Sequence, residues 1–171
     1  MNKDTQSWSI AWSHGHGLVQ ALGGMLGPVH FKIAPDRHVQ PFAIFPWADE
    51  IAPADEPALE GLLKRGRGEW PCVPFGMPPE SKALDWHHPI HGASANAHWV
   101  RMDDSKDSAF IKLRFDHDAA SPLDFLERDI RGVQGQAEIH CRLPTTLSIH
   151  PSSPLILNYV MRLSDASAHK P

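Results

Sequence analysis

The chain has 171 residues, 42% of them hydrophobic, which is enough for the core of one ordinary domain. The formal net charge is −4 and acidic and basic residues are interspersed, so nothing indicates a nucleic-acid partner. No apolar run approaches the roughly 20 residues that cross a bilayer, and the first residues lack the apolar core of a signal peptide. We therefore expect a single domain over residues 1–171 without a membrane span.

The first third of the chain predicts short strands joined by turns. Bulky and small residues alternate over 8–12, which is the period of a half-buried strand, and 13–17 predicts a turn. Two β-favouring runs, 25–33 and 39–47, flank Pro35 and Asp36, whose chemistry suits the turn of a hairpin. An exposed loop is expected next, and then one or two helical turns that Gly61 weakens.

The remainder predicts an antiparallel β fold. Five prolines between positions 70 and 89 exclude a long regular element, so we expect an ordered functional loop there. Short β-favouring segments follow at about the 8–12 residue spacing of antiparallel folds, over 98–102, 109–115, 123–130, 136–143, 145–150 and 155–163. Lys112 and Arg114 are expected to point away from the core. The pattern as a whole predicts an all-β sandwich.

Two motifs lie around that loop. Residues 67–76 read R-G-E-W-P-C-V-P-F-G, and residues 88–99 read H-P-I-H-G-A-S-A-N-A-H-W. This order resembles the aldose 1-epimerase (galactose mutarotase-like) family, including its hexose-6-phosphate epimerase-like branch. In that family an R-G-G-x-P…P-x-F-G turn and an H-G-F-A-R-x-x-x-W turn both face the sugar. The resemblance implies a galactose mutarotase-like antiparallel supersandwich.

The resemblance also implies roles for individual residues. Opening a pyranose ring needs a base and an acid, and histidine suits the acid role because its pKa lies near neutrality. Arg67 matches the family's sugar-binding arginine, whose rigid fork holds hydroxyls or a phosphate, and His91 matches its first histidine. A second histidine, the general acid, follows a C-R-L-P motif in the family. Here the motif at 141–144 is followed by His150, which is therefore the second catalytic candidate.

Aromatic residues of the two motifs complete the expected sugar site. Trp70, Phe75 and Trp99 are expected to offer flat apolar faces to the sugar ring. Simpler alternatives stay open: the aromatics of 70–76 fill the core, His150 ends a strand without a role, and Arg67 is a solvated charge with Arg65 as its nearest competitor for a ligand.

The chain departs from the family pattern in three ways. Glu69 and Trp70 replace the usual second glycine and apolar residue of the first turn, although its prolines and Phe75-Gly76 remain. Ala95 stands where the family has the arginine of H-G-F-A-R, which removes one sugar or phosphate contact. The family's glutamate base lies near the C-terminus of a chain of roughly 300 residues, a length near the upper end of single-domain size. Glu127 and Glu138 lie on expected strands, but their context does not match that base. The similarity runs from about Gly23 to His150, so we expect a mutarotase-like domain truncated relative to the family.

Three functional hypotheses follow. The first is an aldose 1-epimerase-like isomerase that interconverts the anomers of a hexose, phosphorylated or not, by acid/base ring opening without a cofactor. The second is a carbohydrate-binding or regulatory domain that keeps the sugar pocket but lacks the base. The third is a β-sandwich with an unrelated interaction role. A sandwich cut midway exposes a strand edge and an apolar face, so we expect a homodimer or a separate C-terminal partner.

Metal and cysteine chemistry are the remaining possibilities. His87, His88 and His91 lie close together, but Pro89 disfavours the helix that such zinc motifs use, and no C-x-x-C pair exists. We therefore expect no native metal site. Cys72 is expected to serve packing, because free cysteine is usually a small buried hydrophobe. Two cysteines make no disulfide framework, so a reducing cytoplasm is the expected compartment.

Overall fold

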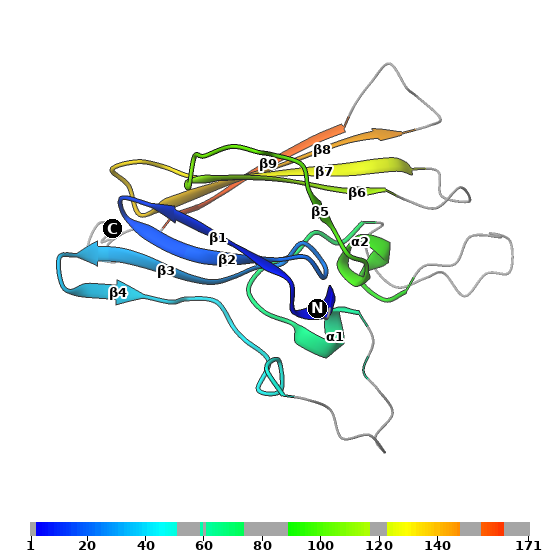
Figure 1. The fold of residues 1–171 in the computed structure, drawn as a ribbon, viewed down its shortest axis with the longest axis horizontal. Coiled ribbons are helices and arrows are strands. Elements are labelled where there is room, and N and C mark those ends of the chain that lie inside the picture. The colour runs from blue at the N-terminus through cyan, green and yellow to red at the C-terminus, as the bar shows by residue number, and fades with distance from the viewer. Residues whose placement is uncertain are drawn as a thin grey trace, which may run out of the picture.

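The computed structural model describes residues 3–50, 59, 61–73, 89–116, 123–147 and 155–162. Two antiparallel sheets lie one over the other as two layers (Figure 1). The first sheet has the strand order β1 (Ser7–Trp12), β2 (Gly15–Gln20), β3 (Leu26–Ala34), β4 (Arg37–Val39). The second has the order β5 (Val100–Arg101), β6 (Phe110–Asp116), β7 (Leu123–Gly132), β8 (Glu138–Leu147), β9 (Leu155–Arg162). The predicted all-β antiparallel fold is confirmed.

Among the described residues, three short helices accompany the sheets. A 3-10 helix, Lys3–Thr5, precedes β1, while α1 (Leu62–Arg65) and α2 (Gly92–Asn96) lie near one end of the layers (Figure 1). Within the part of the chain that the structure describes, no helix has the length and apolar character needed to cross a membrane.

Both sheets contribute to one hydrophobic core. The strand period of two places alternate side chains on the inner face, and in β6 these are Ile111 and Leu113, both fully buried. Lys112 and Arg114 lie on the outer face of β6, as predicted. Burial of such aliphatic side chains stabilises the fold by about 1.5–3 kcal/mol each. The fully buried members of this core are Ile10, Val19, Leu26, Val29, Phe31, Ile111, Leu113, Leu126, Ile130 and Ile139.

Trp12 occupies a narrow slot between the layers. Its indole N–H donates to the carbonyl of Gln136 at 2.9 Å. A methyl group on Gly132 would lie 2.5 Å from the indole ring, and one on Gly15 would lie 2.4 Å from it. Both positions therefore require glycine because a side chain would overlap the Trp12 ring. At Gly15 the His30 carbonyl is a second obstacle, 2.8 Å away.

Three predicted elements have different bounds in the structure. Residues 13–17 were expected to form a turn, but β2 already begins at Gly15. The second strand of the predicted hairpin is shorter than expected, because β4 ends at Val39. Beyond it, the Phe42 N–H donates to the Gln40 side-chain oxygen at 2.5 Å. Prolines at 41 and 46 have no N–H to offer a partner strand. The predicted segment 136–143 and the described part of 145–150 belong to a single strand, β8, which spans Glu138–Leu147.

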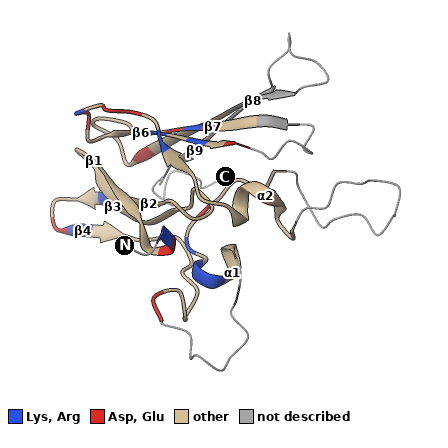
Figure 2. Ribbon diagram, turned by 45° about the vertical axis from the view of Figure 1, so that its right-hand side comes forward, with Lys and Arg blue, Asp and Glu red and all other residues tan. Residues whose placement is uncertain are grey.

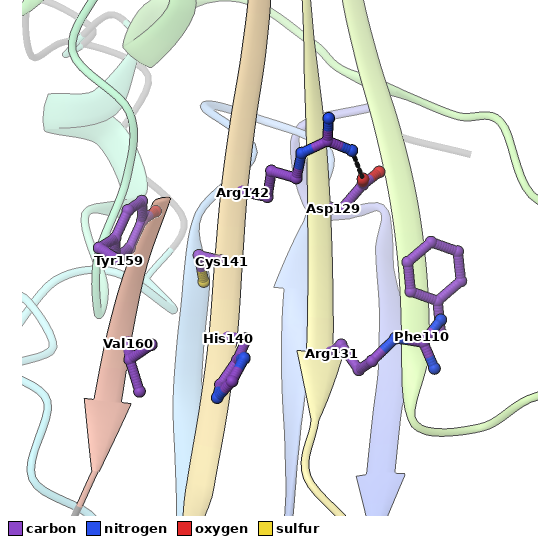
Figure 3. A pocket seen from close by; sticks show the side chains of 8 residues that line it. All are labelled: Phe110, Asp129, Arg131, His140, Cys141, Arg142, Tyr159 and Val160. Carbon is purple, nitrogen blue, oxygen red and sulfur yellow. Dashed lines mark hydrogen bonds and ion pairs between the residues drawn. The ribbon is translucent and has the colours of Figure 1, made fainter. Parts of the chain in front are cut away.

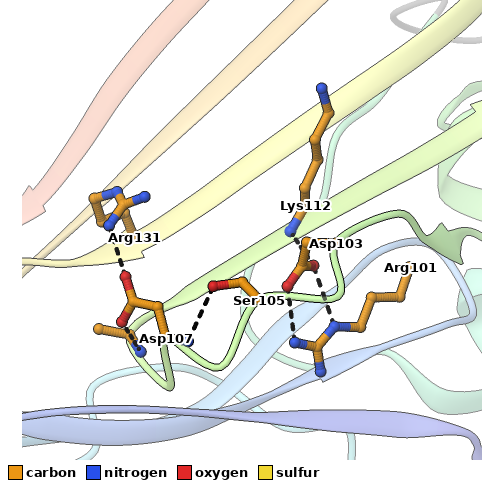
Figure 4. A network of polar contacts seen from close by, with 7 residues as sticks. Arg101, Asp103, Ser105, Asp107, Lys112 and Arg131 are labelled. Atoms are coloured by element: carbon orange, nitrogen blue, oxygen red, sulfur yellow. Dashed lines mark hydrogen bonds and ion pairs between the residues drawn. The ribbon is translucent and has the colours of Figure 1, made fainter.

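The connection from β5 to β6 is held by two aspartates (Figure 4). Asp103 accepts two hydrogen bonds from Arg101, at 2.8 and 3.1 Å, and one from the Lys112 backbone N–H at 2.8 Å. Burial opposes ionisation of Asp103, but these donors lower its pKa. Asp107 accepts from Arg131 of β7 at 3.0 Å. The loop is thereby tied to β6 through Lys112 and to the central strand β7 through Arg131.

Candidate functional site

The first motif, which begins at Arg67, is attached to the start of β3 in the first sheet. The backbone of Glu69 pairs with Leu26 through both its N–H and its carbonyl, at 3.1 and 2.8 Å. Gly68 has φ +69°, and a methyl group there would lie 1.9 Å from the Leu26 carbonyl oxygen. Only glycine fits this approach and this conformation. The tight turn therefore fixes where Trp70 and Cys72 leave the sheet.

The predicted sugar ligand Arg67 is bound within the protein. It is 6% exposed, and its Nη2 donates to the Ala48 carbonyl and to the Asp49 carboxylate, both at 2.8 Å. Its Nε donates to the Arg65 carbonyl at 3.1 Å. The hydrogen bond from Arg67 is the main cause that lowers the pKa of Asp49, against an opposing effect of burial. Arg67 thus anchors the 45–50 region to the motif, and sugar binding by Arg67 stays a prediction.

His91, in the second motif, is the N-cap residue of α2. It is the one non-glycine residue with a left-handed backbone, φ 67°, among the described residues. Its Nδ1 lies 3.9 Å from the Cys72 sulfur, and its ring meets Trp70 edge to face with centroids 6.4 Å apart. A strained backbone at such a position is a feature of functional sites. His91, Trp70 and Cys72 form the group that we call the motif junction.

Ser94 locks the two motifs together. Its hydroxyl donates to the Pro71 carbonyl at 2.7 Å and accepts from the Val73 N–H at 2.8 Å, while its own N–H donates to the Val73 carbonyl at 3.2 Å. Ser94 is fully buried, so these bonds are shielded from water. Segments about twenty residues apart in the sequence are therefore one rigid unit, which is the arrangement that the motif order suggested.

The remaining predicted site residues lie either in the core or outside the described residues. Trp99 is 2% exposed and belongs to the hydrophobic core, where its indole N–H donates to the Ser94 carbonyl at 2.8 Å. Trp99 therefore packs against α2 from the core, and its ring has no exposed face for a ligand. Phe75 and His150 lie outside the described residues, as do the histidines at 87 and 88.

Sequence reasoning missed a buried charge beneath the first motif. Arg128 lies on the inner face of β7 and is fully buried, in phase with Leu126 and Ile130. Its guanidinium binds the Glu69 carboxylate and the Gly24 carbonyl. Burial disfavours its charge, yet Glu69 raises the pKa of Arg128 overall. An arginine in the apolar phase of a strand was the signal that could have identified it.

The carboxylates considered as possible bases lie elsewhere. Glu127 is on the outer face of β7, where it pairs with Lys112 at 2.7 Å. Glu138 binds both His140 and Arg162 on the outer face of β8, and these hydrogen bonds lower its pKa. Lys, Arg, Asp and Glu occur at several positions along β6 and β7 of this sheet (Figure 2). Neither glutamate is placed at the motif junction.

A shallow groove of about 350 Å³ crosses that outer surface (Figure 3). Arg131 covers one end by stacking over the Phe110 ring at 4.4 Å. Arg142 approaches Asp129 at 3.5 Å from the neighbouring strand. Both arginines of the groove are thus partnered, Arg142 with Asp129 and Arg131 with Asp107 in the adjoining loop, which is typical of a solvated sheet face.

Neither cysteine has the surroundings of a nucleophile. Burial is the largest cause that raises the pKa of the Cys72 thiol, and the same is true of Cys141 in the core. Over the described ranges, no three His, Cys, Asp or Glu side chains are grouped so as to hold a metal ion.

Comparison with known proteins adds no assignment: no family model matches the chain, and no curated protein or solved structure matches it significantly.

Proposed function

We propose that this protein binds an aldohexose at the motif junction and interconverts its anomers in the manner of an aldose 1-epimerase. The observation that carries the proposal is the convergence of the two motifs, which Ser94 joins and which brings His91 within 6.4 Å of Trp70, ring centroid to ring centroid. Two motifs that face the sugar in the family that this sequence resembles are therefore neighbours here.

The chemistry of the junction suits a sugar. Trp70 is half-buried and rigidly supported, so its exposed part offers an apolar surface to the C–H face of a pyranose. His91 contacts Cys72 through Nδ1, and its Nε2 has no hydrogen-bond partner among the residues that the structure describes. A histidine nitrogen directed at the ring oxygen or the anomeric hydroxyl can transfer a proton near neutral pH. In this proposal His91 and His150 are the catalytic pair, Trp70 and Phe75 face the sugar, and the buried Arg67 and Trp99 support the pocket from within the protein.

A carbohydrate-binding or regulatory domain without catalysis is the second candidate. It is favoured by the positions of Glu127 and Glu138, which are engaged in ion pairs on the outer face of the second sheet. Under this candidate the junction binds the sugar but no carboxylate removes the anomeric proton. In either case we propose a cytoplasmic protein, in keeping with two cysteines that form no disulfide. Pairing with a second copy or a C-terminal partner is a further proposal, which light scattering tests.

Magnetisation exchange between the anomeric protons of glucose and galactose tests the catalytic proposal. We expect exchange above the buffer rate with the wild-type chain and a loss of that exchange in His91→Gln. His38→Gln is the matched control, because His38 is an exposed histidine on β4, remote from the motif junction. Sugar line broadening without exchange would support the binding domain instead. If the wild-type chain causes neither line broadening nor exchange, both candidates are refuted.

A further inference from the structure

The Glu69 carboxylate, next to the motif junction, is bound by two residues of the second sheet, Arg128 of β7 and the Tyr159 hydroxyl of β9. Arg128 projects from β7 into the space between the layers and binds the Glu69 carboxylate. Its side chain is 1% exposed, whereas that of Glu69 retains 22%. A guanidinium this deeply buried needs a countercharge, because an isolated buried ion is strongly destabilising. Among the described residues Glu69 is the only carboxylate that pairs with it.

Glu69 is attached on both sides. Its backbone is hydrogen-bonded to Leu26 in the first sheet, and its carboxylate accepts hydrogen bonds from Arg128 and from the Tyr159 hydroxyl in the second. Trp70 follows directly in the chain, and Cys72 lies two residues further on against His91. The position of Glu69 therefore determines where the first motif meets the second.

We propose that Arg128 is a positioning residue, which through Glu69 holds Trp70 and Cys72 in register against His91. The register itself can be tested without a ligand, and its importance for sugar binding rests on the function proposed above. If the pair served only to stabilise the fold, its loss would loosen the whole sandwich evenly. If it positions the motif, its loss loosens the junction while the core stays closed.

The two cysteines allow these outcomes to be separated within one molecule. Cys72 is half-buried at the junction, and Cys141 is 2% exposed in the core. Alkylation by N-ethylmaleimide, followed site by site with mass spectrometry, reports local opening at Cys72 and opening of the core at Cys141. Because the Cys141 sulfur lies 3.8 Å from Arg128 Nη2, the Cys141 rate is judged in Glu69→Gln, which keeps the Arg128 side chain. The variants are Glu69→Gln, Arg128→Met and the double variant, which leaves no unpaired buried charge and so keeps the test valid if a single variant does not fold.

We expect Cys72 alkylation to accelerate at least about tenfold in all three variants, the change that follows from losing one hydrogen bond between charged groups. Cys141 should stay protected in Glu69→Gln. Arg131→Met, on the exposed face of the same strand, is the matched control and should alkylate like the wild type. An unchanged Cys72 rate in the double variant, or a parallel rise at Cys141 in Glu69→Gln, would overturn the positioning role.

Titrating the wild type and the double variant with glucose and galactose then tests whether Arg128 matters for sugar binding, the part of the inference that rests on the proposed function. If Arg128 positions the sugar site, the double variant should bind the sugar at least about tenfold more weakly than the wild type, in proportion to the opening at Cys72. Equal affinity would overturn the role in sugar binding. A wild-type chain that binds neither sugar would refute the proposed function, and the alkylation result would still decide whether Arg128 positions the junction.

Discussion

Arg128 and Arg131 stand three residues apart on β7 and therefore face opposite sides of the second sheet. Arg128 is buried between the layers against Glu69, whereas the Arg131 side chain is 53% exposed and pairs with Asp107 at 3.0 Å. Water and salt can replace the partner of the second arginine but not of the first. On the same strand, the charge of Arg128 is therefore important for the stability of the core, whereas the charge of Arg131 is dispensable.

A third ion pair lies between these extremes. Arg67 is 6% exposed, but its partner Asp49 is 74% exposed, so one end of the pair is in the protein and the other in water. The three pairs form a series in burial. Substituting each arginine by methionine, which preserves much of the side-chain volume, should reveal the same series in stability.

The largest effect is expected for Arg128→Met. The change leaves the Glu69 carboxylate without its cation and should lower the free energy of unfolding by about 3–5 kcal/mol, the cost of breaking a buried pair. Urea denaturation measures this loss. The double variant with Glu69→Gln should recover most of it, because neither charge then remains buried, and an equal loss in the double variant would contradict the assignment.

Arg67→Met should have an intermediate effect. The substitution removes donors to the Ala48 and Arg65 carbonyls and to Asp49, of which the first is buried. We expect the free energy of unfolding to fall by about 1–3 kcal/mol, since a lost hydrogen bond leaves a buried acceptor unsatisfied. Urea denaturation under the same conditions provides the comparison. A loss no greater than that of Arg131→Met would show that Arg67 is not an anchor.

Measuring the free energy of unfolding at falling pH should reveal the contribution of Asp49, the exposed partner of Arg67. The folded-state pKa of Asp49 is below its unfolded value, so its contribution to stability is complete above about pH 4 and is lost as the pH falls through the folded pKa. Asp49→Asn should therefore lose less stability than the wild type between about pH 5 and about pH 2.5. We expect a difference below about 1 kcal/mol that shrinks in salt, because Asp49 is largely exposed. Parallel curves would exclude this contribution.

The smallest effect is expected for Arg131→Met. Its ion pair with Asp107 and its stacking on Phe110 are both at the surface. The free energy of unfolding should stay within about 0.5 kcal/mol of the wild type. Thermal and urea denaturation would detect a larger loss, which would place the outer face of the second sheet among the stabilising features.

The sequence predicted the sheets well because strand alternation is a local signal. Residues 109–115 predicted β6 together with its two outward cations, and 123–130 predicted most of β7. The predicted ends of strands were wrong where pairing with a distant strand determines them. Gly15, for example, adjoins a tight turn but already pairs with Phe31 of β3. Local chemistry alone could not show that partner.

The candidate site was predictable only in part. The order of the two motifs suggested that they meet, but the joining residue Ser94 has no distinctive sequence context. Arg67 carried no sign that Asp49 and the Ala48 carbonyl would surround it. Arg128 lies 59 residues from Glu69, and contacts at that separation follow from the layering of the sheets rather than from any spacing in the chain.

The slot around Trp12 has a consequence for the evolution of this chain. The three atoms nearest to a side chain at position 132 would all belong to the Trp12 indole, whereas position 15 is also blocked by a backbone carbonyl. A smaller residue at 12 would therefore make room at 132 but not at 15. Among natural variants we expect positions 12 and 132 to change together, one shrinking as the other grows, while position 15 remains glycine throughout.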